Sequence, residues 1–183
     1  MNRYMKYQTF RGVRFVLLLL LTLGTFQSPT AFAAKAIDFQ FMDVTGKHLR
    51  LSDFKGKWVL VNFWTPGCPM CRSEAPSLNS LNQSGDVVVI RVGLDYGPDE
   101  SVVKDVATSN DFRVTAIIAG GARRDKNSAC RQVGPVDFYP TSYLYDPTGE
   151  IVMFIPGQVK QDKLLSFMGN WARNRNRTET KGD

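Results

Sequence analysis

The most specific chemical pattern in the sequence is a pair of cysteines, Cys68 and Cys71, separated by two residues. A thiolate is the nucleophile in disulfide exchange, and an unperturbed cysteine, whose pKa is about 8.5, is only a few per cent ionised at neutral pH. The first turn of a helix carries unpaired amide donors and the positive end of the helix dipole, which favour an anion. A cysteine at that position therefore gains reactive thiolate.

The residues around the pair predict such a position. Residues 58–64 are a nearly continuous apolar run, which is typical of a strand buried on both faces. Pro69 suits the first turn of a helix, because its missing N–H would have no partner there. We expect Cys68 to lie at the helix tip as the attacking nucleophile, and Cys71 to face the interior as the thiol that resolves a mixed disulfide.

The two cysteines could also form a structural disulfide or part of a zinc site. Structural zinc usually has four thiolate or imidazole ligands, whereas the chain offers only the distant Cys130 and the single histidine His48 besides the pair. A structural disulfide across so short a loop would constrain the unfolded chain little. The sequence therefore favours a redox-active pair, with no metal and no cofactor beyond its own sulfurs.

Strands and helices alternate in the predicted secondary structure. The expected strands cover residues 37–41, 58–64, 87–94, 114–119, 141–145 and 151–155, the last two as a hairpin. The expected helices cover residues 69–82, 99–109, 128–133 and 161–173. Pro76 should kink the first helix, since it removes a backbone donor. This order indicates an α/β fold with a mixed central sheet flanked by helices.

The net charge of +6 comes from the ends of the chain. Residues 1–33 carry basic but no acidic side chains, and the polar tail at residues 173–183 is also basic. Between them, residues 34–172 carry equal numbers of basic and acidic side chains. We therefore expect one domain at residues 34–172 without a basic surface for phosphates, and no nucleic-acid partner.

The first 33 residues have the three parts of a secretory signal: a basic start, an apolar run at residues 15–26, and small residues up to Ala33. Cleavage after Ala33 is our preferred interpretation, because polar residues end the run before the roughly 20 residues needed to cross a bilayer. The alternative is an uncleaved membrane anchor at residues 15–33. Either way the domain would lie outside the cytoplasm, for example in the periplasm.

Residues 61–76, with the sequence VNFWTPGCPMCRSEAP, resemble the active-site segment of the TlpA/ResA branch of thioredoxin-like proteins. Two further motifs of that branch match: a Gly-Lys and Leu-Ser-Asp lead-in at residues 46–47 and 51–53, and a Pro-Thr at residues 140–141 before an apolar strand. The resemblance covers about residues 37–171 and implies a thioredoxin-like fold.

The resemblance also implies site residues beyond the cysteines. It implies a cis peptide bond between Tyr139 and Pro140, packed against the redox pair, where an extended client segment could pair with the backbone. It also implies that Glu74, three residues past Cys71, relays the proton that this thiol must lose. The alternatives are an ordinary strand-entry proline and a solvated glutamate. The expected catalytic residues are Cys68, Cys71, Glu74 and Pro140, and the expected substrate-binding residues are Tyr139, Pro140 and Trp64.

Three positions need separate comment. Thioredoxin has a buried aspartate in the strand before the active site, where this chain has Asn62, which cannot exchange a proton at neutral pH. The branch usually has an aromatic residue directly before the first cysteine, where this chain has Gly67, and this opens the surface around Cys68. Cys130 is expected to be a small buried residue, with a regulatory or intermolecular thiol as the alternative.

These features predict an exported thiol–disulfide oxidoreductase that reduces disulfides of client proteins. The resemblance implies a role in cytochrome c maturation or metal-site assembly, with re-reduction by a membrane-bound electron donor. A redoxin-type thiol peroxidase is one alternative, because Thr65 precedes Cys68 by three residues, although Val61 stands where redoxins have a proline. A copper-binding module is another, since thiolates select Cu(I), but only Met70 lies nearby as a further soft ligand.

Overall fold

The computed structural model describes residues 37–179, so the predicted signal or anchor at residues 1–33 lies outside the described residues. With η denoting a 3-10 helix, the elements are β1 (Gln40–Met42), β2 (His48–Arg50), η1 (Leu51–Phe54), β3 (Trp58–Trp64), α2 (Pro69–Ser73), α3 (Ala75–Gln83), β4 (Val87–Gly93), α4 (Ser101–Ser109), β5 (Ala116–Ala119), η2 (Ala129–Gln132), β6 (Thr141–Tyr145), β7 (Ile151–Pro156) and α5 (Gln161–Glu179). Every predicted strand and helix has a counterpart; β3 and β6 have the predicted ends, and the ends of the others are shifted.

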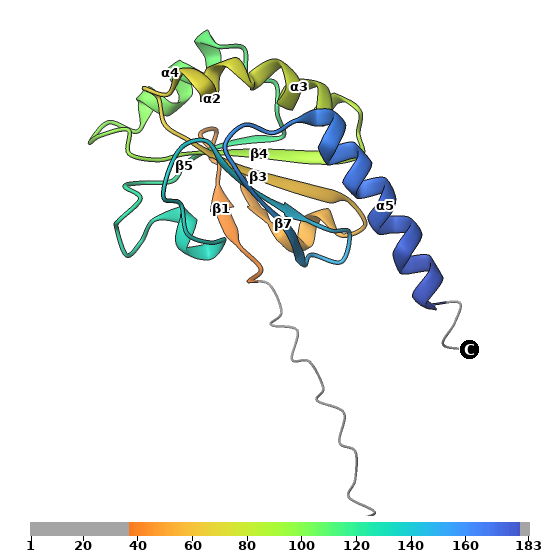
Figure 1. Ribbon diagram of the computed structural model, residues 1–183. Coiled ribbons are helices and arrows are strands. Elements are labelled where there is room, and N and C mark those ends of the chain that lie inside the picture. Colours follow the sequence, from red (N-terminus) through yellow and green to blue (C-terminus); the bar gives the residue numbers. More distant parts are fainter. Residues whose placement is uncertain (1–36, 180–183) are drawn as a thin grey trace, which may run out of the picture. The chain divides into compact units, whose positions relative to one another are not determined.

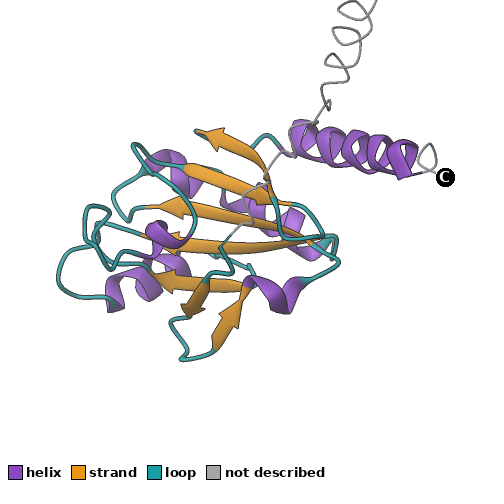
Figure 2. Cartoon of the chain, turned by 90° about the horizontal axis from the view of Figure 1, so that it is seen from below, coloured by secondary structure: helices purple, strands orange, loops and turns teal. Residues whose placement is uncertain are grey.

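The central sheet has the strand order β5-β4-β3-β6-β7 (Figures 1 and 2). Strands β3, β4 and β5 run parallel, whereas β6 and β7 are antiparallel to their neighbours. The predicted α/β fold with a mixed sheet is therefore confirmed. The expected first strand is shorter than predicted and pairs with β2 in a separate two-stranded sheet, with one bridge from Asp43 to Ile118 of the central sheet.

Side chains alternate between the two faces of the sheet, and each face has its own core. One face of β3 contributes Val59, Val61 and Phe63 to a core with β1, η1 and η2. The other face contributes Leu60 to a core with α3 and α5, and Trp64 to a smaller cluster with α2 and α4. Figure 1 shows α2, α3 and α4 together on one side of the sheet, with β1 on the other.

The helix expected over residues 69–82 is in fact two helices, α2 and α3, which meet at Glu74. Pro76 lies in the first turn of α3, where its missing N–H has no partner to lose. One continuous helix would have placed the proline ring against the carbonyl of Arg72, so the helix is interrupted at Glu74, whose backbone angles stay in the helical region. Glu74 thereby ends one helix and begins the next.

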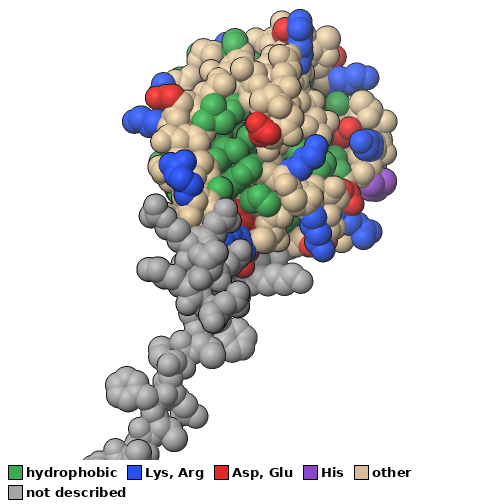
Figure 3. Space-filling model, turned by 90° about the vertical axis from the view of Figure 1, so that its right-hand side faces the viewer, with side chains coloured by type: hydrophobic (Ala, Val, Ile, Leu, Met, Phe, Trp, Pro, Cys, Tyr) green, Lys and Arg blue, Asp and Glu red, His purple; other side chains and the backbone are tan. Residues whose placement is uncertain are grey.

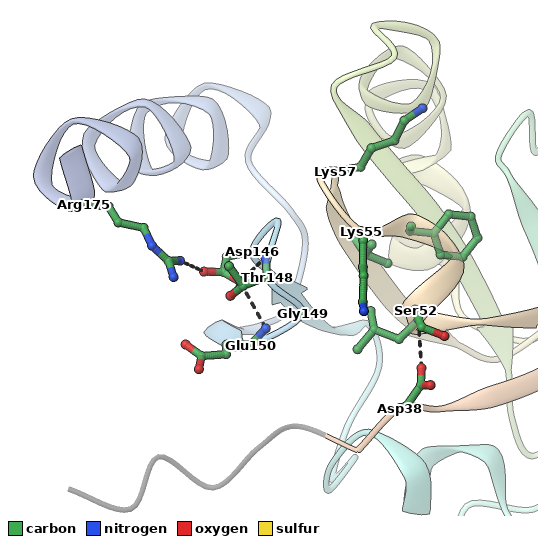
Figure 4. Close-up of a pocket in the computed structure, with 12 residues that line it drawn as sticks. Asp38, Ser52, Lys55, Lys57, Asp146, Thr148, Gly149, Glu150 and Arg175 are labelled. Carbon is green, nitrogen blue, oxygen red and sulfur yellow. Dashed lines mark hydrogen bonds and ion pairs between the residues drawn. The ribbon is translucent and has the colours of Figure 1, made fainter. Parts of the chain in front are cut away.

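The C-terminal helix also differs from expectation. Helix α5 continues to Glu179, so the predicted boundary between domain and tail at residue 173 falls inside a helix. Arg175, in this extension, donates a hydrogen bond to the buried Asp146 at 2.6 Å (Figure 4). Within residues 37–179, no helix combines the length and the apolar character needed to cross a membrane.

Candidate active site

Cys68 and Cys71 are joined by a disulfide at the point where the central strand β3 leads into α2, with their Cα atoms 5.3 Å apart. Cys68 is the N-cap residue of α2, and its Sγ accepts a hydrogen bond from the backbone nitrogen of Cys71 at 3.1 Å. Cys68 is half-buried, whereas Cys71 is fully buried. An attacking reagent can therefore reach the first sulfur more easily than the second.

The loop before Cys68 is held by its own hydrogen bonds. The Cys68 backbone nitrogen donates to the Thr65 carbonyl at 3.1 Å, and Arg72 Nη1 reaches back from α2 to the Pro66 carbonyl at 2.8 Å. Gly67 is exposed, and a Cβ built on it would meet no atom within 4 Å. The surface beside Cys68 is therefore open, as the sequence predicted.

Trp64 was expected among the substrate-binding residues, and its position corrects that expectation. Its side chain is fully buried beneath the loop, in a cluster with Cys71 and Val103, and meets Phe112 edge to face. A fully buried indole cannot touch an arriving protein. Trp64 therefore supports the redox loop from below.

Glu74 is almost completely buried at the junction of α2 and α3. Its Oε1 accepts a hydrogen bond from Asn62 Nδ2 at 2.9 Å, and its Oε2 accepts one from the backbone nitrogen of Val159 at 3.2 Å. Burial raises the pKa of the Glu74 carboxyl above its ordinary value of 4.5, and the hydrogen bond from Asn62 and the charge of Arg91 oppose that rise. This burial excludes the alternative that Glu74 is a solvated glutamate on the helix surface.

A row of polar side chains crosses three strands beneath Glu74. Asn62 on β3 lies opposite Ser142 on β6 and opposite Arg91 on β4. Asn62 Nδ2 donates to Ser142 Oγ at 3.0 Å, and Arg91 Nε donates to Asn62 Oδ1 at 3.0 Å. Sequence reasoning missed Arg91, although a single charged residue within the apolar run at residues 87–94 was the signal that could have found it.

The loop before β6 completes the site. The Tyr139–Pro140 peptide bond is cis, as the resemblance implied, and Pro140 is buried. The Tyr139 ring packs against the same small cluster as Cys68, and its hydroxyl donates to Asp95 Oδ2 at 2.8 Å. Burial raises the pKa of the Tyr139 hydroxyl, so it stays a donor to that carboxylate.

Arg123 holds the other side of this loop. Its guanidinium lies 5.4 Å from the centre of the Tyr139 ring, and its Nε lies 3.5 Å from Asp95 Oδ2. Its Nη1 also donates to the Asp137 carbonyl at 2.6 Å. Three loops that follow β4, β5 and η2 are thereby tied together next to the redox pair.

Cys130 is free and buried, as expected, with its Sγ 3.2 Å from Ser128 Oγ. Among residues 37–179, no group of three or more His, Cys, Asp or Glu side chains is arranged to hold a metal ion. On the face shown in Figure 3, Lys and Arg side chains are interspersed with Asp and Glu, which reflects the balanced charge of residues 34–172.

A mixed sheet, a Cys-x-x-Cys disulfide at the start of the helix after the central strand, and a cis-proline loop packed against the same cluster define the thioredoxin-like class of proteins. Comparison with known proteins agrees. The AhpC/TSA family matches residues 32–154. The thiol-disulfide oxidoreductase ResA of Bacillus cereus is 32% identical over 135 residues, which cover 73% of this chain and 75% of that protein.

Solved structures give the same result. A putative thioredoxin from Neisseria meningitidis is 28% identical and superposes with a TM-score of 0.63, covering 76% of this chain and 91% of that one. The pneumococcal exposed lipoprotein thioredoxin from Streptococcus pneumoniae is 30% identical and superposes with a TM-score of 0.61. The match covers 73% of this chain and 98% of that one. The chain belongs to the AhpC/TSA family and, within it, to the ResA-like thiol–disulfide oxidoreductases.

Proposed function

We propose that this protein is an exported protein-disulfide reductase. The Cys68 thiolate attacks one sulfur of a client disulfide, the client S–S bond breaks, and the client's second sulfur leaves as a thiolate. Cys71 then loses its proton and attacks Cys68, which forms the Cys68–Cys71 disulfide and releases the first client sulfur as a thiolate. Two electrons pass from the dithiol to the client, and the client thiolates take up protons from water or from Glu74.

The observation that carries this proposal is the unequal exposure of the two sulfurs. Cys68 is half-buried at the N-cap of α2, where its Sγ accepts an amide hydrogen bond that favours the thiolate. Cys71 is fully buried and is therefore protected from a second client. A structural disulfide needs no such asymmetry.

The surroundings of Cys68 favour a protein as the substrate. Met70, between the two cysteines, is 53% exposed, and Phe138, directly before the cis-proline loop, is 47% exposed. Exposed apolar side chains beside a reactive sulfur can bind an extended polypeptide segment. We assign the backbone at Tyr139 and Pro140 as the place where that segment pairs.

Glu74 is assigned as the acceptor of the Cys71 proton. Its carboxyl is buried and its pKa is raised, which brings it closer to neutral pH, where an acid–base group is most effective. Asn62 cannot take this role, because an amide does not ionise. Instead it donates a hydrogen bond that orients the carboxyl.

Export is supported by the secretory pattern of residues 1–33 and by the likeness to an exposed pneumococcal lipoprotein. We infer clients outside the cytoplasm, with apocytochrome c or a metal-site protein as the first to test. Re-reduction by a membrane-bound donor then closes the cycle, since each turnover leaves the Cys68–Cys71 pair oxidised.

The first test is to trap the mixed disulfide. Cys71→Ser should accumulate a covalent adduct between Cys68 and an oxidised client peptide, whereas Cys68→Ser should not. Both variants would be incubated with the peptide and analysed by mass spectrometry without reductant. An equal yield from both variants would contradict the assignment. Consumption of hydrogen peroxide by the wild type, measured in parallel, would instead favour the peroxidase alternative.

The second test is the equilibrium reduction potential of the pair, measured by thiol labelling in defined redox buffers. A reduction potential of roughly −270 mV, as in thioredoxin, supports a reductase. A reduction potential of roughly −120 mV, as in DsbA, would reverse the direction of electron flow and make the protein a disulfide donor.

A further inference from the structure

Arg91 is the most unusual residue in the core. It lies in the middle of β4, a strand whose seven residues are all buried, and its own side chain is fully buried. A buried charge is costly unless it is paired and hydrogen-bonded. Burial lowers the pKa of Arg91 to about 10, which still leaves the guanidinium charged at neutral pH. The chain therefore keeps a permanent cation beneath the redox helix.

Both side-chain hydrogen bonds that Arg91 donates go to residues at the redox site, whereas its Nη1 has no hydrogen-bond partner within the described part of the chain. Its Nε donates to Asn62 Oδ1 at 3.0 Å, and its Nη2 donates to the backbone carbonyl of Cys71 at 2.8 Å. The same Nη2 lies 3.7 Å from Glu74 Oε1. The guanidinium also lies 3.7 Å from the centre of the Phe112 ring, and this cation–π contact stabilises its positive charge.

One guanidinium nitrogen thus joins the residue that loses a proton to the residue that we assign as its acceptor. Through Asn62, which hydrogen-bonds both Arg91 and Glu74, the cation is also tied to the carboxyl by a second route. The three residues lie on β4, β3 and the α2–α3 junction. These contacts involve Cys71 only through its backbone, so they do not require the Cys68–Cys71 bond.

The other charged groups near Glu74 are weaker partners. Lys160, in the segment before α5, acts on Glu74 through its charge, and Asp162 of α5 lines the same surface pocket as Glu74. Lys160 is exposed to solvent, so its charge is screened, whereas Arg91 is not. Arg91 is therefore the dominant charge on this carboxyl.

We propose that Arg91 is a positioning residue of the redox site, which holds the Glu74 carboxyl beside the same guanidinium nitrogen that binds the Cys71 carbonyl, and keeps that carboxyl ionised until it takes the thiol proton. The inference rests on the proposed function. In the step, the Cys71 S–H bond breaks, its proton passes to Glu74 to give a neutral carboxylic acid, and the thiolate attacks Cys68 of the mixed disulfide. Without the cation, the carboxyl would already be protonated over more of the pH range.

The test is a titration of Glu74 in the reduced protein. The sequence after residue 33 contains four glutamates, so selective 13C labelling of glutamate carboxyls gives a simple spectrum, in which Glu74→Gln identifies one signal. Arg91→Met should raise the midpoint of that signal by about one pH unit or more, and Arg91→Lys by less, because it keeps the charge. Arg113→Met is the control, since Arg113 is exposed and pairs with Asp111.

The rate of client release in a single turnover should depend on pH in the same way. The pH at which release falls off on the acidic side should be higher in Arg91→Met than in the wild type, with Arg91→Lys between them. A merely structural role would lower the melting temperature without moving the Glu74 midpoint, and that result would overturn the inference. The proposed function fails separately, if Cys71→Ser traps no client on Cys68. If the wild type and Glu74→Gln release client with identical pH profiles, Glu74 is not the acceptor, whatever the titration shows.

A measurement on the wild type keeps the inference testable if Arg91→Met does not fold. The 15Nε resonance of Arg91 should move with the same midpoint as the Glu74 carboxyl, because the two side chains share Asn62. Independent midpoints would show that the guanidinium does not sense the carboxyl, and the inference would be wrong.

Discussion

Glu74 Oε2 accepts a hydrogen bond from the backbone nitrogen of Val159, 85 residues further along the chain, at 3.2 Å. Asn62 holds the other oxygen from the sheet. The carboxyl is therefore clamped between the central strand β3 and the segment that leads into α5. This arrangement explains how a charged group can stay almost completely buried at a helix junction.

The buried carboxyl should reduce stability as the pH rises. Its pKa is raised in the folded state, so the folded protein holds this proton more tightly than the unfolded chain does. Stability is then greatest below the ordinary value of 4.5 and is lost as the pH rises through the higher folded-state value. Glu74→Gln should flatten this part of the profile, and because it also leaves the buried Arg91 without its counter-charge, it should be less stable than the wild type at pH 7. Urea unfolding of the oxidised proteins from pH 4 to pH 8 measures the difference, and parallel profiles would contradict it.

The hydroxyl of Tyr139 should matter for protein clients more than for small disulfides. Tyr139→Phe removes the hydrogen bond to Asp95, a contact with a charged acceptor that is worth about 1.5–3 kcal/mol. The cis-proline loop then loses one of its ties, so we expect a several-fold rise in KM for a disulfide-bonded peptide. Reduction of hydroxyethyl disulfide, which needs only Cys68, should change little. Equal losses for both substrates would place the defect in the redox pair.

The same loop can be tested from its other end. Asp95 has a φ of 53°, a conformation that asparagine tolerates well. Asp95→Asn should keep the backbone, and its oxygen can still accept from the Arg123 backbone nitrogen. Its amide nitrogen would then face the Tyr139 hydroxyl and donate to it instead of accepting from it, and the pairing with the Arg123 side chain would weaken. We expect a smaller rise in KM than in Tyr139→Phe, and an unchanged KM would show that the charge of Asp95 is not needed.

A bulky residue at position 67 should be accepted by the fold. A Cβ at Gly67 meets no atom within 4 Å, so Gly67→Trp should change the melting temperature by no more than a few degrees. The indole would cover part of the surface beside Cys68 and restrict which clients can approach. Rates with a panel of oxidised peptides should fall unevenly, with Gly67→Ala as the control. A uniform fall would indicate a change in the reactivity of Cys68 instead.

Asp146 should stabilise the β6–β7 turn mainly through Oδ1. This oxygen accepts hydrogen bonds from the backbone nitrogens of Thr148 and Glu150 and from the Thr148 hydroxyl (Figure 4). Asp146→Ala should cost about 2–3 kcal/mol of unfolding free energy, since buried donors lose their acceptor. Asp146→Asn keeps an oxygen there and should cost less than about 1 kcal/mol, because the partner Arg175 is 42% exposed and its charge is screened. Equal losses would assign the stability to the ion pair.

The order of strands and helices could be predicted because each element has a clear period. The apolar run of β3 and the hairpin of β6 and β7 were placed to within a residue. The break at Glu74 could not be predicted in the same way, because Pro76 is compatible with both a kink and a new helix start. The partners of the Glu74 carboxyl could not be predicted either, since they lie at residues 62 and 159, far from it in sequence.

The redox pair was predictable because the two-residue spacing of Cys68 and Cys71 can be read from the sequence and is enough to let the two thiols form a disulfide. Arg91 was not, because its role depends on which residue lies opposite it in the sheet. Only the parallel register of β3 and β4 places it beside Asn62. The run at residues 58–64 predicted a buried strand that includes Trp64, but the sequence does not show that α4 and Phe112 are what cover its indole.

The position of Glu74 also separates the surface on which a client would bind from the surface through which a proton would leave the redox site. Glu74 lines a surface pocket with Ser73, Ser77 and the segment at residues 158–162, whereas the client surface that we assign is formed by Cys68, Tyr139 and Pro140. These two sets share no residue. A polypeptide lying across Cys68 would leave the pocket at Glu74 open to water, so the proton of each turnover could reach bulk solvent while the client is still bound.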